Sequence, residues 1–163
     1  MKNKKGFTLV ELLAVIVVLG IVMGIAAVAI TNVLDSTRKN AFVASGKQFV
    51  EGAKALVEAD MVEAMLGGSG TYVTTCNGSF DIAVEKIKTK GDTTDKTPWG
   101  TAYDKANSKV VVTAADNCQS FTYAIFLRDA SGDHYIASAA VTDITTTVAV
   151  GEGNLDSKHV FAK

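Results

Sequence analysis

The hydrophobic pattern of the chain begins with one long apolar run. Between Phe7 and Ile30 the polar side chains are Thr8 and Glu11, and Glu11 is the single charge. A helix over this run would be roughly 36 Å long at about 1.5 Å per residue, enough to span a bilayer. A carboxylate costs about 2.5–3.5 kcal/mol at the centre of a membrane segment and less near its end. The position of Glu11 therefore indicates a functional role, with a partner for its charge.

The helical pattern continues beyond the apolar run as far as Leu66. The stretch 31–66 holds no proline, and the breaker Gly67-Gly68-Ser69-Gly70 follows it. Apolar residues recur at spacings of three and four and predict one buried face: Phe42, Phe49, Ala53, Leu56, Val57, Met61, Ala64 and Met65. We expect one helix over 7–66, near 90 Å long. Its first half has nothing in its own chain to bury it, so it must lie in lipid or among copies of itself.

The remainder, 67–163, predicts a smaller mixed region. Ser79 is placed to cap a short helix through Lys90, ended by Gly91. Segments rich in Val, Ile, Tyr, Phe and Thr predict strands over 109–114, 120–128 and 134–142, with a fourth over 143–150. The polar tail after Gly151 is expected to wrap or fray. One antiparallel sheet packed on the outer half of the long helix is the simplest arrangement, and the fold class is α+β.

The flanks of the apolar run set its orientation. Lys2, Lys4 and Lys5 precede it, and the next basic residues are Arg38 and Lys39. The positive-inside tendency keeps such an N-terminus in the cytoplasm and carries the rest across the membrane. An alternative is an ordinary secretory signal cut near the small residues 26–29, although the long unbroken run argues against it.

The stretch Lys5-Gly6-Phe7-Thr8-Leu9-Val10-Glu11 resembles the start of a type IV prepilin. In that family a prepilin peptidase cuts after the glycine and methylates the new N-terminus. The resemblance implies a leader over 1–6, cleavage between Gly6 and Phe7, N-methylation of Phe7 and an assembly role for Glu11. It covers about 25 residues, with 7–30 as the membrane or filament-core part. Many pilins also have a proline late in this segment, whereas the single proline here is Pro98.

Glu11 and the new amine of Phe7 are natural partners, because pairing lowers the cost of two charges in an apolar medium. The pair can form within one helix or between neighbouring subunits, and the resemblance favours the second. Gly20 and Gly24 form a Gly-x-x-x-Gly pattern. They are either a close-packing motif or two tolerated small residues that weaken the helix.

Cys76 and Cys118 are the two cysteines of the chain. Outside the reducing cytosol they would form a disulfide closing a loop of about 40 residues, and such bonds typically contribute 2–4 kcal/mol. The alternative is a pair of buried thiols. Pilins often carry a disulfide, usually one that closes a C-terminal loop, whereas Cys118 lies 45 residues before the last residue of this sequence. Two cysteines and two separated histidines give no metal-ligand spacing.

Several other local patterns each have a functional and a simpler structural interpretation. Pro98-Trp99-Gly100 with Tyr103 resembles a motif of the major pseudopilins of type II secretion, where calcium binds in the following loops. Acidic side chains are available for such a site, but they form no calcium-loop pattern: Asp92, Asp95, Asp104 and Asp116. We expect Trp99 to act as a packing anchor and Asp133-His134 to be an exposed turn. The sequence has no nucleophile elbow, P-loop or dinucleotide motif, so no enzyme activity and no cofactor are predicted.

Charge adds one limit to the range of partners. The chain has 16 basic and 17 acidic side chains. Removal of the leader would take three lysines with it, leaving 13 basic and 17 acidic side chains and a net side-chain charge of −4. This mildly acidic chain has no broad basic footprint for nucleic acid.

Three functions follow as hypotheses. The first is a type IV pilus subunit, inserted in the cytoplasmic membrane and then polymerised at the cell surface. Its partners would be copies of itself, the prepilin peptidase and an assembly machinery with a cytoplasmic ATPase. Adhesion and motility would then be properties of the filament. The second is a pseudopilin of a type II secretion or DNA-uptake system. The third is a membrane-anchored domain that does not polymerise, which would need neither Glu11 nor the Lys-Gly-Phe junction.

Overall fold

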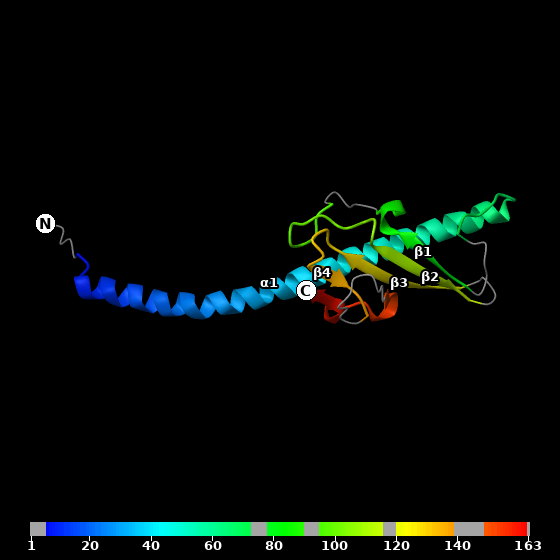
Figure 1. Cartoon of the computed structure of the whole chain (residues 1–163). Coiled ribbons are helices and arrows are strands. Elements are labelled where there is room, and N and C mark those ends of the chain that lie inside the picture. Colours follow the sequence, from blue (N-terminus) through cyan, green and yellow to red (C-terminus); the bar gives the residue numbers. More distant parts are fainter. Residues whose placement is uncertain (1–5, 73–77, 90–94, 116–119, 139–148, 163) are drawn as a thin grey trace. The chain divides into compact units, whose positions relative to one another are not determined.

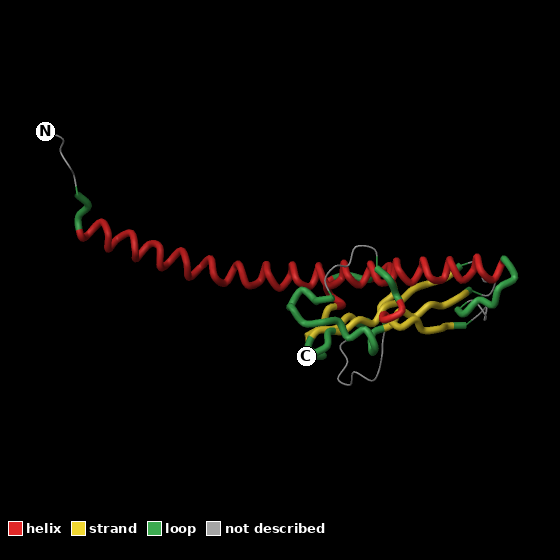
Figure 2. The backbone as a smooth tube through the Cα atoms, turned by 90° about the horizontal axis from the view of Figure 1, so that it is seen from above, coloured by secondary structure: helices red, strands yellow, loops and turns green. Residues whose placement is uncertain are grey.

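The computed structural model describes residues 6–72, 78–89, 95–115, 120–138 and 149–162. The chain divides into two units, Met1–Thr37 and Arg38–Lys163. Helix α1 (Leu9–Met65) begins in the first unit and ends in the second, which also contains all the described strands (Figure 1). In the second unit, called the head below, α1 lies along one face of an antiparallel sheet (Figure 2).

The ends of α1 confirm the predicted 7–66 helix to within two residues. The helix ends at Met65 because Gly67 adopts a φ of 86°, a left-handed conformation that glycine takes at little cost. The backbone N–H of Gly67 then donates to the carbonyl of Ala64 at 3.2 Å, and that of Gly68 to Glu63 at 3.0 Å. This pair of bonds is a Schellman motif, which satisfies carbonyls that a helix end leaves unpaired.

The buried face of α1 in the head runs from Phe42 to Asp60. Its buried members recur at helical spacing: Phe42, Val43, Gly46, Phe49, Val50, Ala53, Val57 and Asp60. Leu56 and Met61 are half-buried at its margin. The predicted continuation of this face to Ala64 and Met65 is wrong, because Asp60 is the last buried residue of α1 and the final turn is exposed.

The described sheet has six strands, all paired antiparallel. The main path is β1-β2-β3-β4-β6, and β5 pairs with β3 beside β4. The strand bounds are β1 Ser79–Ala83, β2 Lys109–Ala114, β3 Phe121–Arg128, β4 His134–Ile136, β5 Val150–Gly151 and β6 Val160–Ala162.

Two of the predicted strands match closely and others are shorter. β2 has the predicted bounds, and β3 begins one residue later than expected. β4 ends at Ile136 instead of Thr142, and residues 139–142 of that prediction lie outside the described part. The fourth predicted strand, 143–150, also falls almost entirely outside it, although Val150 begins β5.

The predicted helix over Ser79–Lys90 is wrong. Its first residues form strand β1, followed by the short 3-10 helix η1 (Val84–Lys86). Phe80 and Ile82 also fit a period of two, and pairing of all five β1 residues with β2 decides between the two patterns. Gly91, the predicted end of that helix, lies outside the described residues.

The polar tail is also more ordered than predicted. It contains the 3-10 helices η2 (Glu152–Asn154) and η3 (Ser157–His159) and then strand β6, which pairs with β4. Its apolar residues explain this outcome, because Leu155 and Val160 are buried in the main core. The tail therefore adds an edge strand to the sheet.

Candidate functional site

The residues singled out at the N-terminus lie at the start of α1. Gly6, Phe7 and Thr8 precede the helix in a non-helical stretch, and Phe7 is 88% exposed. The peptide bond between Gly6 and Phe7 is therefore outside regular structure and open to solvent. Cleavage at this bond stays a prediction.

Thr8 and Glu11 form a capping box at this helix end. The carboxylate oxygen Oε2 of Glu11 accepts hydrogen bonds from the backbone N–H of Thr8 at 2.9 Å and from its hydroxyl at 2.8 Å. The backbone N–H of Glu11 lies 3.3 Å from the Thr8 oxygen. Such reciprocal bonds satisfy donors that a helix start leaves unpaired. Oε1 of Glu11 accepts no hydrogen bond from a described residue, so one face of the carboxylate remains available.

The apolar run that follows is exposed along its length. The large hydrophobic side chains from Leu9 to Leu34 range from 80% to 48% exposed. By length and composition, α1 is the one described helix that could cross a membrane. Because such a surface is unstable in water, it requires an apolar environment. That agrees with the prediction that this half lies in lipid or among copies.

Gly20 and Gly24 lie within this exposed run. A Cβ built on either glycine would meet no atom within 4 Å outside the local helix backbone. No contact within the described chain therefore requires glycine at these positions. Whether they pack closely against another helix stays a prediction.

In the head, Trp99 is the packing anchor that its sequence context predicts. Its ring meets Phe42 edge-on at 5.4 Å between centroids and stacks on the imidazole of His134 at 3.8 Å. Phe42 also stacks on Tyr103 at 5.9 Å, so the four rings form one cluster at the start of the head. His134, predicted to be an exposed turn residue, is instead only partly exposed and belongs to this cluster.

His134 also contacts a buried carboxylate that the sequence analysis did not single out. Asp129 is fully buried, and its Oδ2 lies 3.1 Å from Nδ1 of His134. Oδ1 accepts bonds from the backbone N–H of Asp133 at 2.9 Å and of His134 at 3.3 Å. Burial raises the pKa of Asp129, but the bonds from His134 and one from Ser131 outweigh burial and leave the pKa below its usual value. The carboxylate thus stays charged and fixes the turn before β4.

The acidic residues considered for calcium are engaged in ion pairs where the structure describes them. Asp95 pairs with Lys105, and Asp104 pairs with Arg128. Burial raises the pKa of Asp104, but hydrogen bonds from Asn107 and Arg128 lower this pKa by a larger amount. The net shift of the pKa is therefore downward. No group of three metal-ligating side chains occurs among the described residues, and Asp92 and Asp116 are not among them. Cys76 and Cys118 also lie outside the described residues, so their disulfide stays a prediction.

Together, these features define a class of protein. A long helix with an exposed apolar first half, and an antiparallel sheet packed on its second half, form a pilin-like α+β fold. Pilin-like proteins are structural and generally not enzymes.

A comparison with protein families refines this class. Residues 1–27 match the family model of the prokaryotic N-terminal methylation motif. The N-terminus thus carries a prepilin-type motif of the kind found in pilins and pseudopilins, and this motif implies processing by a prepilin peptidase. Comparisons with curated proteins and with solved structures gave no match.

Sequence reasoning missed two residues of these sites. Thr8 was recognisable, because Thr-x-x-Glu before an apolar run is the sequence signature of a capping box. Asp129 gave no such signal, because it is buried and meets His134 only in the folded head.

Proposed function

We propose that this chain is a structural subunit of a type IV pilus. It is inserted in the membrane as a prepilin, cleaved after Gly6, methylated at Phe7 and polymerised through the apolar half of α1. The observation that carries the proposal is the exposed surface from Leu9 to Leu34 directly behind a prepilin-type motif. A simple membrane anchor would need the surface but not the motif.

Glu11 supplies the register for assembly. Cleavage after Gly6 leaves a charged amine on Phe7, and methylation keeps that charge. Oε2 of Glu11 is occupied by Thr8, whereas Oε1 is open to a second donor. A carboxylate accepts about four hydrogen bonds in total, so the capping box and an intersubunit bond are compatible. The Phe7 amine of a neighbouring subunit is the proposed donor.

Burial of apolar surface alone does not drive this assembly. Lipid tails and a core of packed helices are both apolar, so moving α1 between them gains little from the hydrophobic effect. Specific packing and the Glu11–Phe7 pair select the filament, and a cytoplasmic ATPase in the assembly machinery supplies the energy. The subunit thus passes from the cytoplasmic membrane to a filament outside the cell.

The second candidate is a pseudopilin of a type II secretion or DNA-uptake system. The motif Pro98-Trp99-Gly100 favours it, and Gly100 has a φ of 89° that suits glycine at this turn. The same turn places the ring of Trp99 on that of Phe42. This packing role alone would explain the Pro98-Trp99-Gly100 turn in any pilin-like head. We therefore rank the pilus subunit first.

The test is the intact mass of this protein in filaments sheared from its native cells. A chain that begins at methylated Phe7 and is abundant in the sheared fraction supports the pilus subunit. The same processed chain confined to the membrane fraction would favour the pseudopilin. An uncut chain beginning at Met1 would contradict both.

A further inference from the structure

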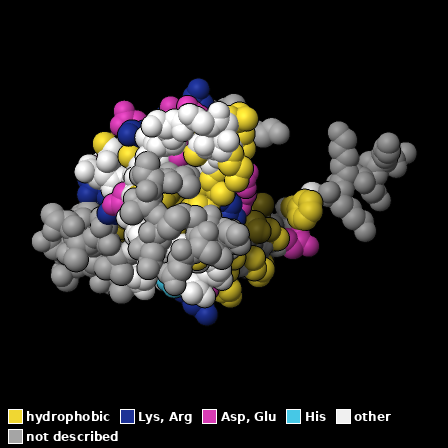
Figure 3. All heavy atoms as spheres, turned by 90° about the vertical axis from the view of Figure 1, so that its right-hand side faces the viewer, with side chains coloured by type: hydrophobic (Ala, Val, Ile, Leu, Met, Phe, Trp, Pro, Cys, Tyr) yellow, Lys and Arg dark blue, Asp and Glu magenta, His cyan; other side chains and the backbone are white. Residues whose placement is uncertain are grey.

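The head has one exposed patch of large hydrophobic side chains among its described residues. Val62, Met65 and Leu66 are 56%, 79% and 83% exposed and are here called the distal patch. Val62 and Met65 lie one turn apart at the end of α1, and Leu66 follows directly, with its backbone N–H bonded to the carbonyl of Val62. Figure 3 looks onto this end of the head, where hydrophobic side chains gather beside charged ones. All other exposed large hydrophobics of the described chain precede Arg38.

Acidic side chains flank the distal patch. Glu58 lies one turn before Val62 on the same side of α1, and Glu63 follows Val62 directly. Both are exposed, and neither forms an ion pair with a described residue. By contrast, Lys54 lies 2.9 Å from Glu51 and 2.6 Å from Glu152. The far end of α1 therefore presents apolar side chains with unpaired negative charge.

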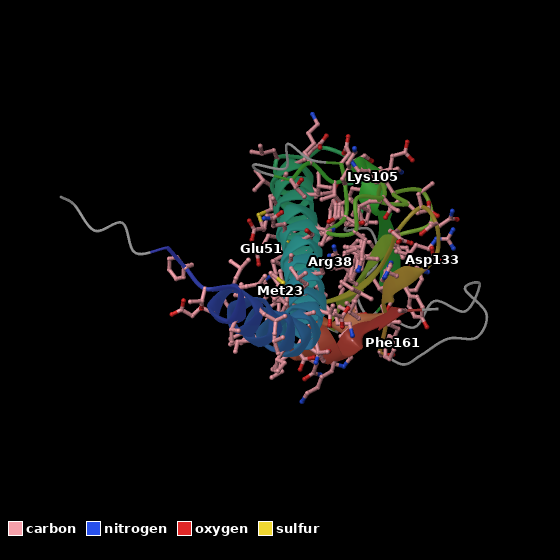
Figure 4. All side chains as sticks on the ribbon, turned by 90° about the vertical axis from the view of Figure 1, so that its left-hand side faces the viewer. Met23, Arg38, Glu51, Lys105, Asp133 and Phe161 are labelled. Carbon is pink, nitrogen blue, oxygen red and sulfur yellow. The ribbon has the colours of Figure 1, made fainter. Side chains whose placement is uncertain are left out.

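The opposite charge occurs where α1 enters the head. The stretch 38–47 contains three basic residues and no acidic one. Of these, Arg38 and Lys47 are exposed and form no ion pair with a described residue. Figure 4 shows Arg38 at this end of the head and Glu51 and Asp133 on opposite sides of it. The head portion of α1 thus has a basic start and an acidic end.

We propose that the distal patch and its acids dock on the basic start of the head helix in a second copy of this chain. The two surfaces are different parts of one subunit, so the interface is heterologous. Heterologous interfaces that do not close into a ring generate open helical filaments. In a parallel array, copies shifted along the helix axis bring the acidic end of one beside the basic start of the next. This inference rests on the proposed pilus function and names the head surfaces that assembly uses.

Charge reversal tests the pairing in the full chain. Glu58→Lys with Glu63→Lys places like charges across the interface and should lower the yield of sheared filaments about tenfold or more. Arg38→Glu with Lys47→Glu should do the same. Combining all four changes restores opposite charges and should return the yield to within about threefold of the wild type. Glu85→Lys with Asp133→Lys alters two exposed acids elsewhere by the same net charge and should leave the yield unchanged.

The apolar part is tested by Met65→Gln with Leu66→Gln. These side chains are exposed in the isolated head, so folding should be retained, while filament yield should fall. The amount of processed subunit in the membrane fraction, and its thermal unfolding in detergent, show that each variant still folds.

The outcomes separate this inference from the proposed function. If wild-type cells make filaments and the charge-reversed pairs make as many, the docking surface is wrong and the pilus function stands. A quadruple variant that stays as poor as the pairs would also overturn the docking. Normal filaments that lose attachment to a surface would assign the patch to an external partner instead. Absence of wild-type filaments would contradict the proposed function itself.

Discussion

The backbone of Gly52 in α1 packs directly against the side chain of Ile87. A Cβ built on Gly52 would overlap Ile87 Cγ2 and lie 3.2 Å from the carbonyl oxygen of Lys88. Ile87 is buried in the main core, and its branched side chain has few alternative rotamers. The chain that follows η1 can therefore approach the helix only where a side chain is missing.

We predict that Gly52→Ala destabilises the head by up to about 2 kcal/mol. Alanine favours a helix interior by roughly 1 kcal/mol, but forcing an extra carbon into a packed site costs about 1–3 kcal/mol. Denaturant unfolding of the full chain in detergent measures the difference. Gly153→Ala is the matched control, since nothing lies within 4 Å of its Cβ. Equal stability of the two variants would show that Ile87 can move aside.

A second prediction concerns acid stability. The pKa of Asp129 is lowered in the folded head, mainly by its bonds with His134, which outweigh the effect of burial. A lowered pKa means that the stabilisation is complete above the unfolded pKa of about 3.9 and is lost as pH falls through the folded pKa. We therefore expect the head to lose stability as the pH falls below about 4.

Asp129→Asn should remove part of that acid dependence and cost about 1–3 kcal/mol at pH 7, because its amide brings a donor toward backbone N–H groups. Asp133→Asn, at an exposed neighbouring position, should change little. Thermal unfolding from pH 3 to pH 7 measures both variants. An Asp129→Asn protein that keeps the wild-type pH profile would show that other carboxylates control acid unfolding.

The hydrophobic periodicity of the sequence predicted those helices and strands whose own residues show one clear period. The long helix, β2 and β3 each show a clear period over six or more residues, and the structure confirms them. β1 was missed because Phe80, Ile82 and Val84 fit a strand about as well as Phe80, Ala83 and Ile87 fit a helix. Pairing with β2, which is distant in sequence, settles that choice. β6 has three residues, too few for a visible alternation.

The same distinction applies to the sites. Gly6, Phe7 and Glu11 form a contiguous motif whose chemistry depends on spacing along one segment, so sequence alone identifies it. The Asp129–His134–Trp99 arrangement joins a turn, a strand and a distant loop. Its residue types are ordinary in the sequence, and they meet only in the folded head.

A third prediction concerns the cysteines. If Cys76 and Cys118 are joined, Cys76→Ser, Cys118→Ser and the double variant should lose the same stability, about 2–4 kcal/mol, because each removes one bond. The intact mass of the wild type should also be two hydrogens short. Denaturant unfolding with and without a reductant provides the control, since reduction should reproduce the variants. Two separate thiols would instead give unequal effects that add in the double variant.

The last prediction separates the two roles of Glu11. Glu11→Gln keeps an oxygen that can accept from Thr8, as glutamine does in other capping boxes, but it removes the negative charge. Thr8→Ala has the opposite effect, because it weakens the cap at a cost of about 1 kcal/mol and keeps the charge. Glu11→Val removes both features and makes the run more apolar, so membrane insertion should stay intact.

If Glu11 pairs with the Phe7 amine of a neighbouring subunit, Glu11→Gln and Glu11→Val should both abolish filaments, and Thr8→Ala should reduce them only modestly. The measurement is the processed subunit in the membrane fraction and in the sheared fraction of each strain. Normal filaments from Glu11→Gln would show that the cap, and not the charge, is what assembly requires. Because the charge is what makes an acid costly within a membrane segment, that result would leave no physical reason for a charged glutamate instead of a glutamine at this position.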